Sequence, residues 1–256
     1  ILIFLPNIKP IYHFKTKPME HNINSVKNYK IEANDGLVGE VKEFYFNDQS
    51  WKIRYLIVET GNWLAGRTVL IPFDSLVKEP WKTGLFPVDL TKEQVKNSPD
   101  VDTDKPVSYQ QDLELYGHYA YQRYGGSGFY AGSSAAAMAL ADDPIIDERL
   151  VKEADPKDKR SDDDIHLRST AVLTNYHIHA LDGDIGHVND FIVDDENGKI
   201  VYLVVDTQNW FGGKKVLIST QDVKEINWSE DKIFINITKD LVEKSILFNE
   251  DIYNRN

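Results

Sequence analysis

The chain has 256 residues, which is long enough for two domains of ordinary size and the connections between them. Its 41 acidic residues outnumber 29 basic ones and give a formal net charge of −12. This charge argues against a protein that binds duplex nucleic acid, because phosphate recognition needs a basic surface. Cysteine is absent, which excludes disulfides, thiolate metal sites and a cysteine nucleophile.

The first 24 residues show no pattern of a folded element. The apolar stretch Ile1–Leu5 is followed by Pro6 and Lys9 and is too short to cross a bilayer. It also lacks the longer apolar segment and the cleavage site of a secretory signal. We expect residues 1–24 to be a disordered or non-native extension, with Met19 just ahead of the folded part. The alternative is the remnant of a membrane anchor. The expected location is the cytoplasm, without stable membrane insertion.

Short segments with strand character follow from residue 25 onward, separated by turns rich in Asp, Asn and Gly. They end with a brief helix over 91–98, which stops before Pro99. This succession predicts a small antiparallel β-barrel over 25–98. The predicted strands are 29–33, 39–46, 52–60 and 67–71.

The stretch 33–71 recurs at 180–218 with a constant offset of 147 positions, and 19 of the 39 aligned residues are identical. A repeat of this length indicates two copies of one small module. We therefore predict a second barrel over 166–250, again with a closing helix, and a mainly β fold class. The predicted core of the first copy, with equivalents 147 positions later, is Val41, Phe44, Ile53, Tyr55, Leu56, Val58, Val69 and Ile71.

Residues 99–165, between the copies, differ in composition and are predicted to form a long linker. Residues 108–124 are expected to form a tyrosine-rich helix, because a capping-box pattern opens at Ser108 and two glycines follow the segment. Residues 142–164 hold ten acids against five bases, a composition typical of a disordered or solvated spacer.

Aromatic residues are the candidates for binding a protein partner. Trp63 and Trp210 occupy the same place in each copy, and Trp is enriched among binding hot spots. The alternative is that each Trp closes one end of its barrel. Tyr116, Tyr119 and Tyr124 fall on related turns of the linker helix. They either present an aromatic face to a partner or dock the helix onto a barrel.

The second copy is richer than the first in acidic and imidazole side chains. Asp182, Asp184 and His187 are candidate ligands of a divalent cation, since carboxylates and imidazoles bind such ions. The alternative is a solvated charged surface, because the sequence fits neither an EF-hand loop nor a His-x-x-x-His pair. No nucleophile and base occur in a recognisable arrangement, so we expect neither an enzyme nor a cofactor.

The two copies together resemble the PRC-barrel domain family. The resemblance rests on SVKNYKIEANDGLVGEVKEFYFND (25–48) with WKIRYLIVETGNWLAGRTVLIP (51–72), and on YHIHALDGDIGHVNDFIVDDENGKIVYLVVDTQNWFGGKKVLIS (176–219). It covers about 25–125 and 166–246 and implies a tandem PRC-barrel protein of bacteria with small, mostly antiparallel barrels. In this family, such a domain forms the cytoplasmic part of the H subunit of the photosynthetic reaction centre. A similar domain forms the C-terminal half of a ribosome-maturation factor.

Both of those roles are docking roles, so the resemblance implies a binding module. The predicted function is a non-enzymatic protein-interaction or scaffold module, with a stress-related role and a homodimer among the expectations. The predicted partner is a protein. One alternative is an accessory protein similar to the H subunit, which would relay protons through the acids and histidines of the second copy. The other is a weak metal-responsive binding protein that uses Asp182, Asp184 and His187.

Overall fold

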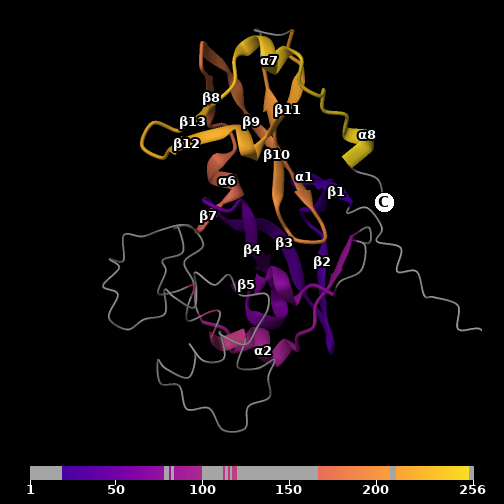
Figure 1. The fold of residues 1–256 in the computed structure, drawn as a ribbon. Coiled ribbons are helices and arrows are strands. Elements are labelled where there is room, and N and C mark those ends of the chain that lie inside the picture. Colours follow the sequence, from indigo (N-terminus) through magenta and orange to yellow (C-terminus); the bar gives the residue numbers. More distant parts are fainter. Residues whose placement is uncertain are drawn as a thin grey trace, which may run out of the picture.

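The computed structural model describes residues 19–77, 81, 84–99, 112, 115, 117–119, 167–207 and 212–253. These residues form two sheets with short helices, in two bodies that lie end to end (Figure 1). We refer to residues 19–99 as module one, the indigo to magenta body, and to residues 167–253 as module two, the orange to yellow body.

The sheet of module one follows the strand order β5-β4-β3-β2-β6. The long strand β3 pairs antiparallel with β2 and β4, whereas β2 and β6 run parallel. Helix α2 closes the module with a capping box between Thr91 and Gln94. The elements are β1 (Glu20–Asn22), α1 (Ile23–Val26), β2 (Lys30–Ala33), β3 (Gly36–Asn47), β4 (Lys52–Glu59), η1 (Gly61–Leu64), β5 (Thr68–Pro72), η2 (Phe73–Ser75), β6 (Leu85–Pro87) and α2 (Lys92–Lys96).

The sheet of module two follows the strand order β11-β10-β9-β8-β13-β12. Its pairing repeats that of module one, including a parallel pair between β8 and β13. The elements are β7 (Leu167–Ser169), α6 (Thr170–Leu173), β8 (His177–Ala180), β9 (Gly183–Asp194), β10 (Ile200–Asp206), β11 (Lys215–Ser219), η3 (Thr220–Asp222), β12 (Val223–Asn227), β13 (Lys232–Ile235), α7 (Lys239–Glu243) and α8 (Glu250–Tyr253).

The predicted fold class is confirmed, since the structure is mainly β in two copies that each carry a short closing helix. The pairing is not wholly antiparallel, because one pair in each copy runs parallel. Among the described residues, neither sheet closes by pairing its first strand with its last. The described residues of the predicted linker helix, 112, 115 and 117–119, are helical.

Each module contributes one short strand to the sheet of the other. Strand β1 is the first strand of module one but pairs antiparallel with β9 of module two, with Glu20 opposite Asp194. Strand β7 is the first strand of module two but pairs with β3 of module one, with Leu167 opposite Asn47. Figure 1 shows β1 and α1 in indigo against the orange strands. The offset of 147 that relates the copies also relates these two pairings. The contact between the modules is therefore pseudo-two-fold symmetric.

A short bridge lies at the centre of this contact. Lys52 and Lys199, which are equivalent residues, pair across it as an antiparallel bridge. The Ile53 N–H donates to the Gly198 carbonyl at 2.9 Å, and the equivalent Ile200 N–H donates to the Trp51 carbonyl at 2.7 Å. We refer to the β1–β9 pair, the β7–β3 pair and this bridge as the seam.

The two modules share one continuous hydrophobic core across the seam. All the predicted core residues of module one are buried, and so are their equivalents in module two, except Tyr202. Tyr202 is half-buried, whereas its equivalent Tyr55 is covered by the linker helix and donates to Asp112 Oδ1 at 2.6 Å. Modules that share a core are expected to unfold together.

The outer faces of the two sheets are covered by helices from different parts of the chain. In module one, Leu115 and Tyr119 of the linker are buried, and the Tyr119 hydroxyl donates to the Leu70 carbonyl at 2.7 Å. In module two, Tyr253 of α8 packs in a separate cluster that includes Leu217, the equivalent of Leu70. Unrelated segments of the chain thus fill the same place on each copy.

Ordered structure begins earlier than the predicted start of the first barrel at residue 25. Residues 20–26 form β1 and α1, and both Ile23 and Val26 are buried. The expected disordered or non-native extension over 1–24 therefore does not extend through residues 20–24, and residues 1–18 lie outside the described residues. The sequence gives no local signal for β1, because its partner strand lies in the other module.

Candidate protein-interaction surface

Trp63 lies at one end of module one, in η1 and next to α2. Its indole N–H donates to the Val38 carbonyl, and its ring packs against the core. The Lys92 ammonium lies 4.5 Å from the centre of the ring, which is a cation–π contact. These contacts occupy the N–H and one face of the indole, which fits the alternative that Trp63 closes the barrel end.

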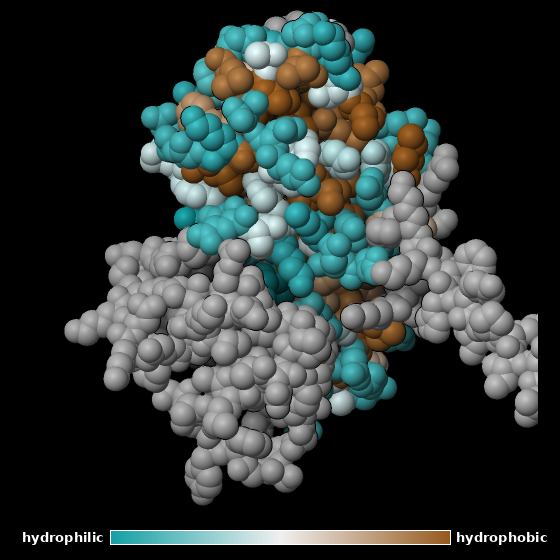
Figure 2. Space-filling model, viewed as in Figure 1, coloured by the Kyte–Doolittle hydropathy of each residue, from teal (hydrophilic) through white to brown (hydrophobic). Residues whose placement is uncertain are grey.

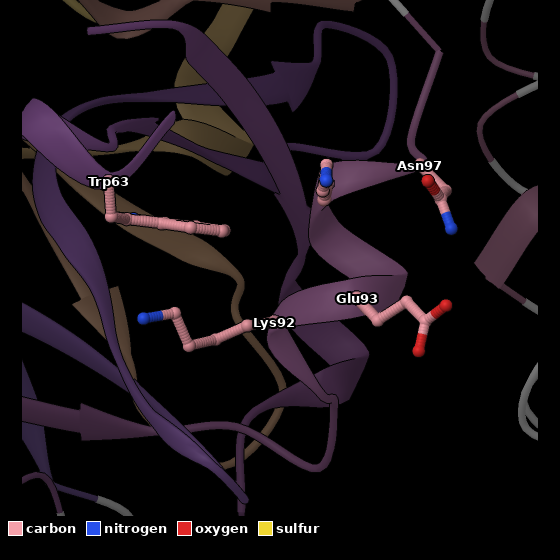
Figure 3. Close-up of a pocket in the computed structure, with 5 residues that line it drawn as sticks. Trp63, Lys92, Glu93 and Asn97 are labelled. Atoms are coloured by element: carbon pink, nitrogen blue, oxygen red, sulfur yellow. The ribbon is translucent and has the colours of Figure 1, made fainter. Parts of the chain in front are cut away.

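A hollow of about 380 Å³ opens beside Trp63, and it is lined by Trp63, Lys92, Glu93, Lys96 and Asn97. Figure 3 shows Trp63 and Lys92 side by side on one side of α2, whereas Glu93 and Asn97 point away on the other side. In a small-molecule site, the polar groups converge on one region. The polar groups that line this hollow do not converge on one region.

Of the other aromatic candidates, only Tyr119 lies within the residues that the structure describes. Tyr119 is buried, and this burial raises the pKa of its hydroxyl to about 12. Its contact with Leu70 fits the alternative in which the helix docks onto a barrel. Tyr116, Tyr124 and Trp210 lie outside the described residues.

The candidate metal ligands make separate contacts. Asp182 Oδ1 accepts a hydrogen bond from the Lys239 N–H at 2.9 Å, at the start of α7. Asp184 Oδ1 lies 2.7 Å from His179 Nδ1, and this hydrogen bond lowers the pKa of the Asp184 carboxyl. His187 lies further along β9. Within the described part of the chain, no group of three or more His, Asp or Glu side chains comes together to hold a metal ion.

Asp190, an acid of the same segment, is buried at the seam. Its Oδ2 accepts from the Asn22 side chain at 2.7 Å, and its Oδ1 accepts from the N–H groups of Asn24 at 3.2 Å and Phe191 at 2.8 Å. Desolvation by burial raises the pKa of Asp190 to about 6, against the opposing effect of two of these hydrogen bonds and of Lys27 and Lys215.

Asp190 is expected to release its proton near pH 6, about two units above an unfolded Asp. The folded state therefore binds the extra proton between about pH 4 and pH 6. Over that range, the contribution of Asp190 to the free energy of unfolding falls with rising pH, by on the order of 3 kcal/mol. Carboxyl ¹³C NMR measures the midpoint of the Asp190 titration, and the variant Asp190→Asn assigns the resonance. A midpoint at or below about 4 would contradict the prediction.

The end of module two that lies away from the seam exposes apolar side chains. Leu181 and Leu241 are 61% and 51% exposed, and Ile246 and Leu247, after α7, are 63% and 50% exposed. The two segments meet there, since the Leu181 N–H donates to the Ile237 carbonyl at 3.0 Å. Figure 2 shows apolar side chains in brown over the upper body, which is module two. Ile246 and Leu247 lie beside β11, since the Ile246 carbonyl accepts from the Leu217 N–H at 2.9 Å. We refer to Leu181 and Leu241 as the distal surface.

Module one carries polar side chains at the positions equivalent to Leu181 and Leu241. Asn34 stands in the place of Leu181 and donates to an Asp carboxylate at 3.2 Å. Gln94 stands in the place of Leu241 and completes the capping box of α2. In module two, the N-cap residue Thr238 makes no side-chain hydrogen bond to α7. A cap of this kind contributes about 1 kcal/mol. Module two therefore lacks a stabilising contact of module one and exposes leucines instead.

These features define a protein of two fused β-modules that share one core and differ in polarity at two equivalent positions of one end. Residues 19–93 and 180–242 match the family model of the PRC-barrel domain, and the chain belongs to this family. PRC-barrel domains are typically interaction modules. A comparison with curated proteins finds no match. No helix among the described residues is long and apolar enough to cross a bilayer.

Proposed function

We propose that this chain is a non-enzymatic protein-interaction or scaffold module, and that a protein partner docks on the distal surface of module two. The difference between the copies supports this proposal most. At equivalent positions module one makes fold-stabilising polar contacts, whereas module two exposes leucines. Exposed apolar side chains that do not stabilise their own fold are typical of binding surfaces.

The chemistry around the distal surface indicates what partner fits. Asp184 and Glu243 are exposed nearby, and the Lys244 ammonium is paired with Asp240 at 2.6 Å. The chain as a whole carries a net charge of −12. A partner with an apolar centre would complement the exposed leucines, and a basic rim on that partner would complement the acidic side chains around them.

The test replaces the two leucines with the residues of module one, in the double variant Leu181→Asn with Leu241→Gln. Tagged chains are used for quantitative pull-downs from lysate, and the captured partner is then purified for direct binding measurements. We expect the double variant to weaken binding by at least about tenfold, because it removes the apolar contacts of the surface.

The control is Leu37→Ser, which removes an exposed leucine from module one instead, at 49% exposure. It should bind as the unaltered chain does. The double variant should unfold at an equal or higher urea concentration, because Gln at the third position of α7 can complete a capping box with Thr238. A captured protein that binds the unaltered chain and the double variant equally would refute the proposed surface.

A further inference from the structure

Two places in the seam are equivalent by symmetry but hold side chains of different size. At one place, the Phe73 ring lies so close to Gly198 that a Cβ atom on Gly198 would be 2.7 Å from it. The equivalent of Phe73 is Thr220, and the equivalent of Gly198 is Trp51. The pseudo-two-fold relation therefore sets Thr220 opposite Trp51. A large residue faces a small one at each place, and both large residues belong to module one.

The backbones at these two places are the same. Trp51 and Gly198 both have left-handed backbones, with φ of +59° and +70°. Their carbonyls accept the two equivalent seam hydrogen bonds from Ile200 and Ile53. Only the side chains therefore distinguish one place from the other, and all of them are buried.

The size pairing discriminates between combinations of modules. Two copies of module one would set Phe73 against Trp51 at both places, and the two rings would overlap. Two copies of module two would set Thr220 against Gly198 at both places and leave two voids. Overlap and voids are both unfavourable in a close-packed interior. One module of each kind satisfies both places.

Two pairs of a basic and an acidic side chain in the seam do not discriminate in this way. His21 lies 3.4 Å from Asp195, and the equivalent Arg168 lies 3.9 Å from Asp48. Pairing like modules would keep an aspartate opposite each of these basic side chains. These two pairs therefore add no selectivity to the size pairing.

We propose that the seam is a pairing interface that accepts one module one with one module two and rejects two modules of the same kind. The partner that it fits is the complementary half of this chain, from the same molecule or from a second copy. Any association of two chains through the seam then exchanges whole modules reciprocally. This proposal is independent of the proposed function, because the distal surface lies at the other end of module two.

The first experiment measures which halves pair. A protease site is inserted within residues 125–141 of the full chain, and two preparations are made that carry different N-terminal tags. The two preparations are mixed, cleaved, unfolded in urea and refolded together. Native mass spectrometry then counts the pairs. We expect pairs of an N-terminal with a C-terminal half to exceed pairs of two N-terminal halves by at least about tenfold. Pairing in random proportions would overturn the proposal.

The Phe73→Thr variant gives module one the small residue that module two already has opposite Trp51. It should allow two N-terminal halves to pair. If it produces no such pairs while its halves still fold, size does not govern the pairing and the proposal is overturned.

A second measurement uses the intact chain and does not depend on refolding of halves. Gly198→Ala should shift the urea midpoint downward by more than Gly66→Ala does. Gly66 has nearly the same φ, +72°, but a Cβ atom there would meet nothing within 4 Å. Adding Phe73→Thr to Gly198→Ala should raise the urea midpoint again by part of this shift. Equal midpoints for the two single variants would show that Phe73 does not fill the place of a side chain at Gly198.

Discussion

Gly39→Ala and Gly186→Ala are each expected to lower the free energy of unfolding by about 3 kcal/mol, the upper end of the usual cost of overpacking. These equivalent glycines lie where β3 and β9 approach the neighbouring strand most closely. A Cβ atom on Gly39 would overlap the Glu59 carbonyl oxygen, and one on Gly186 would overlap the Asp206 carbonyl oxygen. Backbone atoms in a paired strand cannot rotate aside as a side chain can, so the sheet itself must shift. Urea unfolding followed by far-UV circular dichroism measures the loss.

Gly61→Ala is the matched control for these variants. Gly61 has φ of +60° and a Cβ atom there would meet nothing within 4 Å, so its substitution adds only backbone strain of about 1–2 kcal/mol. Because the modules share a core, Gly39→Ala should move the whole unfolding transition to lower urea. Loss of only half of the signal at low urea would show that the modules unfold independently.

A chain that begins at Ser25 is expected to lose about 3–5 kcal/mol of stability, and the loss should be seen in module two. The truncation removes β1 from the edge of β9, together with the buried Ile23. It also removes the Asn22 side chain, which donates to the buried Asp190 carboxylate. Burying an Ile side chain contributes about 1.5–3 kcal/mol, and an unsatisfied buried acceptor costs about 1–3 kcal/mol.

Hydrogen exchange of the amides in residues 191–194 measures this effect directly. The reference is a chain that begins at Met19, which keeps β1. Exchange in β9 should accelerate when the chain begins at Ser25, although every deleted residue belongs to module one. If β9 keeps its protection, then β1 does not stabilise the partner sheet.

The sequence predicts the local elements of this fold well, because its information about them is local. Alternation, turn residues and the repeat identify four strands of each module, the helices that close the modules and part of the core. The exchange of β1 and β7 depends on partners in the other module, which no neighbouring residue indicates. The same is true of Tyr55 and Tyr202, which are equivalent in sequence and differ in burial because only Tyr55 contacts the linker helix.

The candidate surface is harder to predict than the fold, since exposure decides which residues are free to bind. Trp63 is a typical recognition residue, yet its N–H and one ring face are engaged within the module. Leu181 and Leu241 would be assigned to a core from their type alone. Only alignment of the two copies, with Asn34 and Gln94 in their places, marks them as unusual.

The exchanged strands also determine when each sheet can be completed during synthesis on the ribosome. Strand β3 has been made once Asn47 emerges, but the strand that covers its edge emerges only with Leu167. At 5–20 residues per second, the roughly 120 residues between them take roughly 6 to 24 s to add. For that interval the nascent chain carries an uncovered strand edge, the kind of edge that pairs with foreign strands. The seam therefore makes the complete sheet of module one dependent on a segment that has not yet been translated.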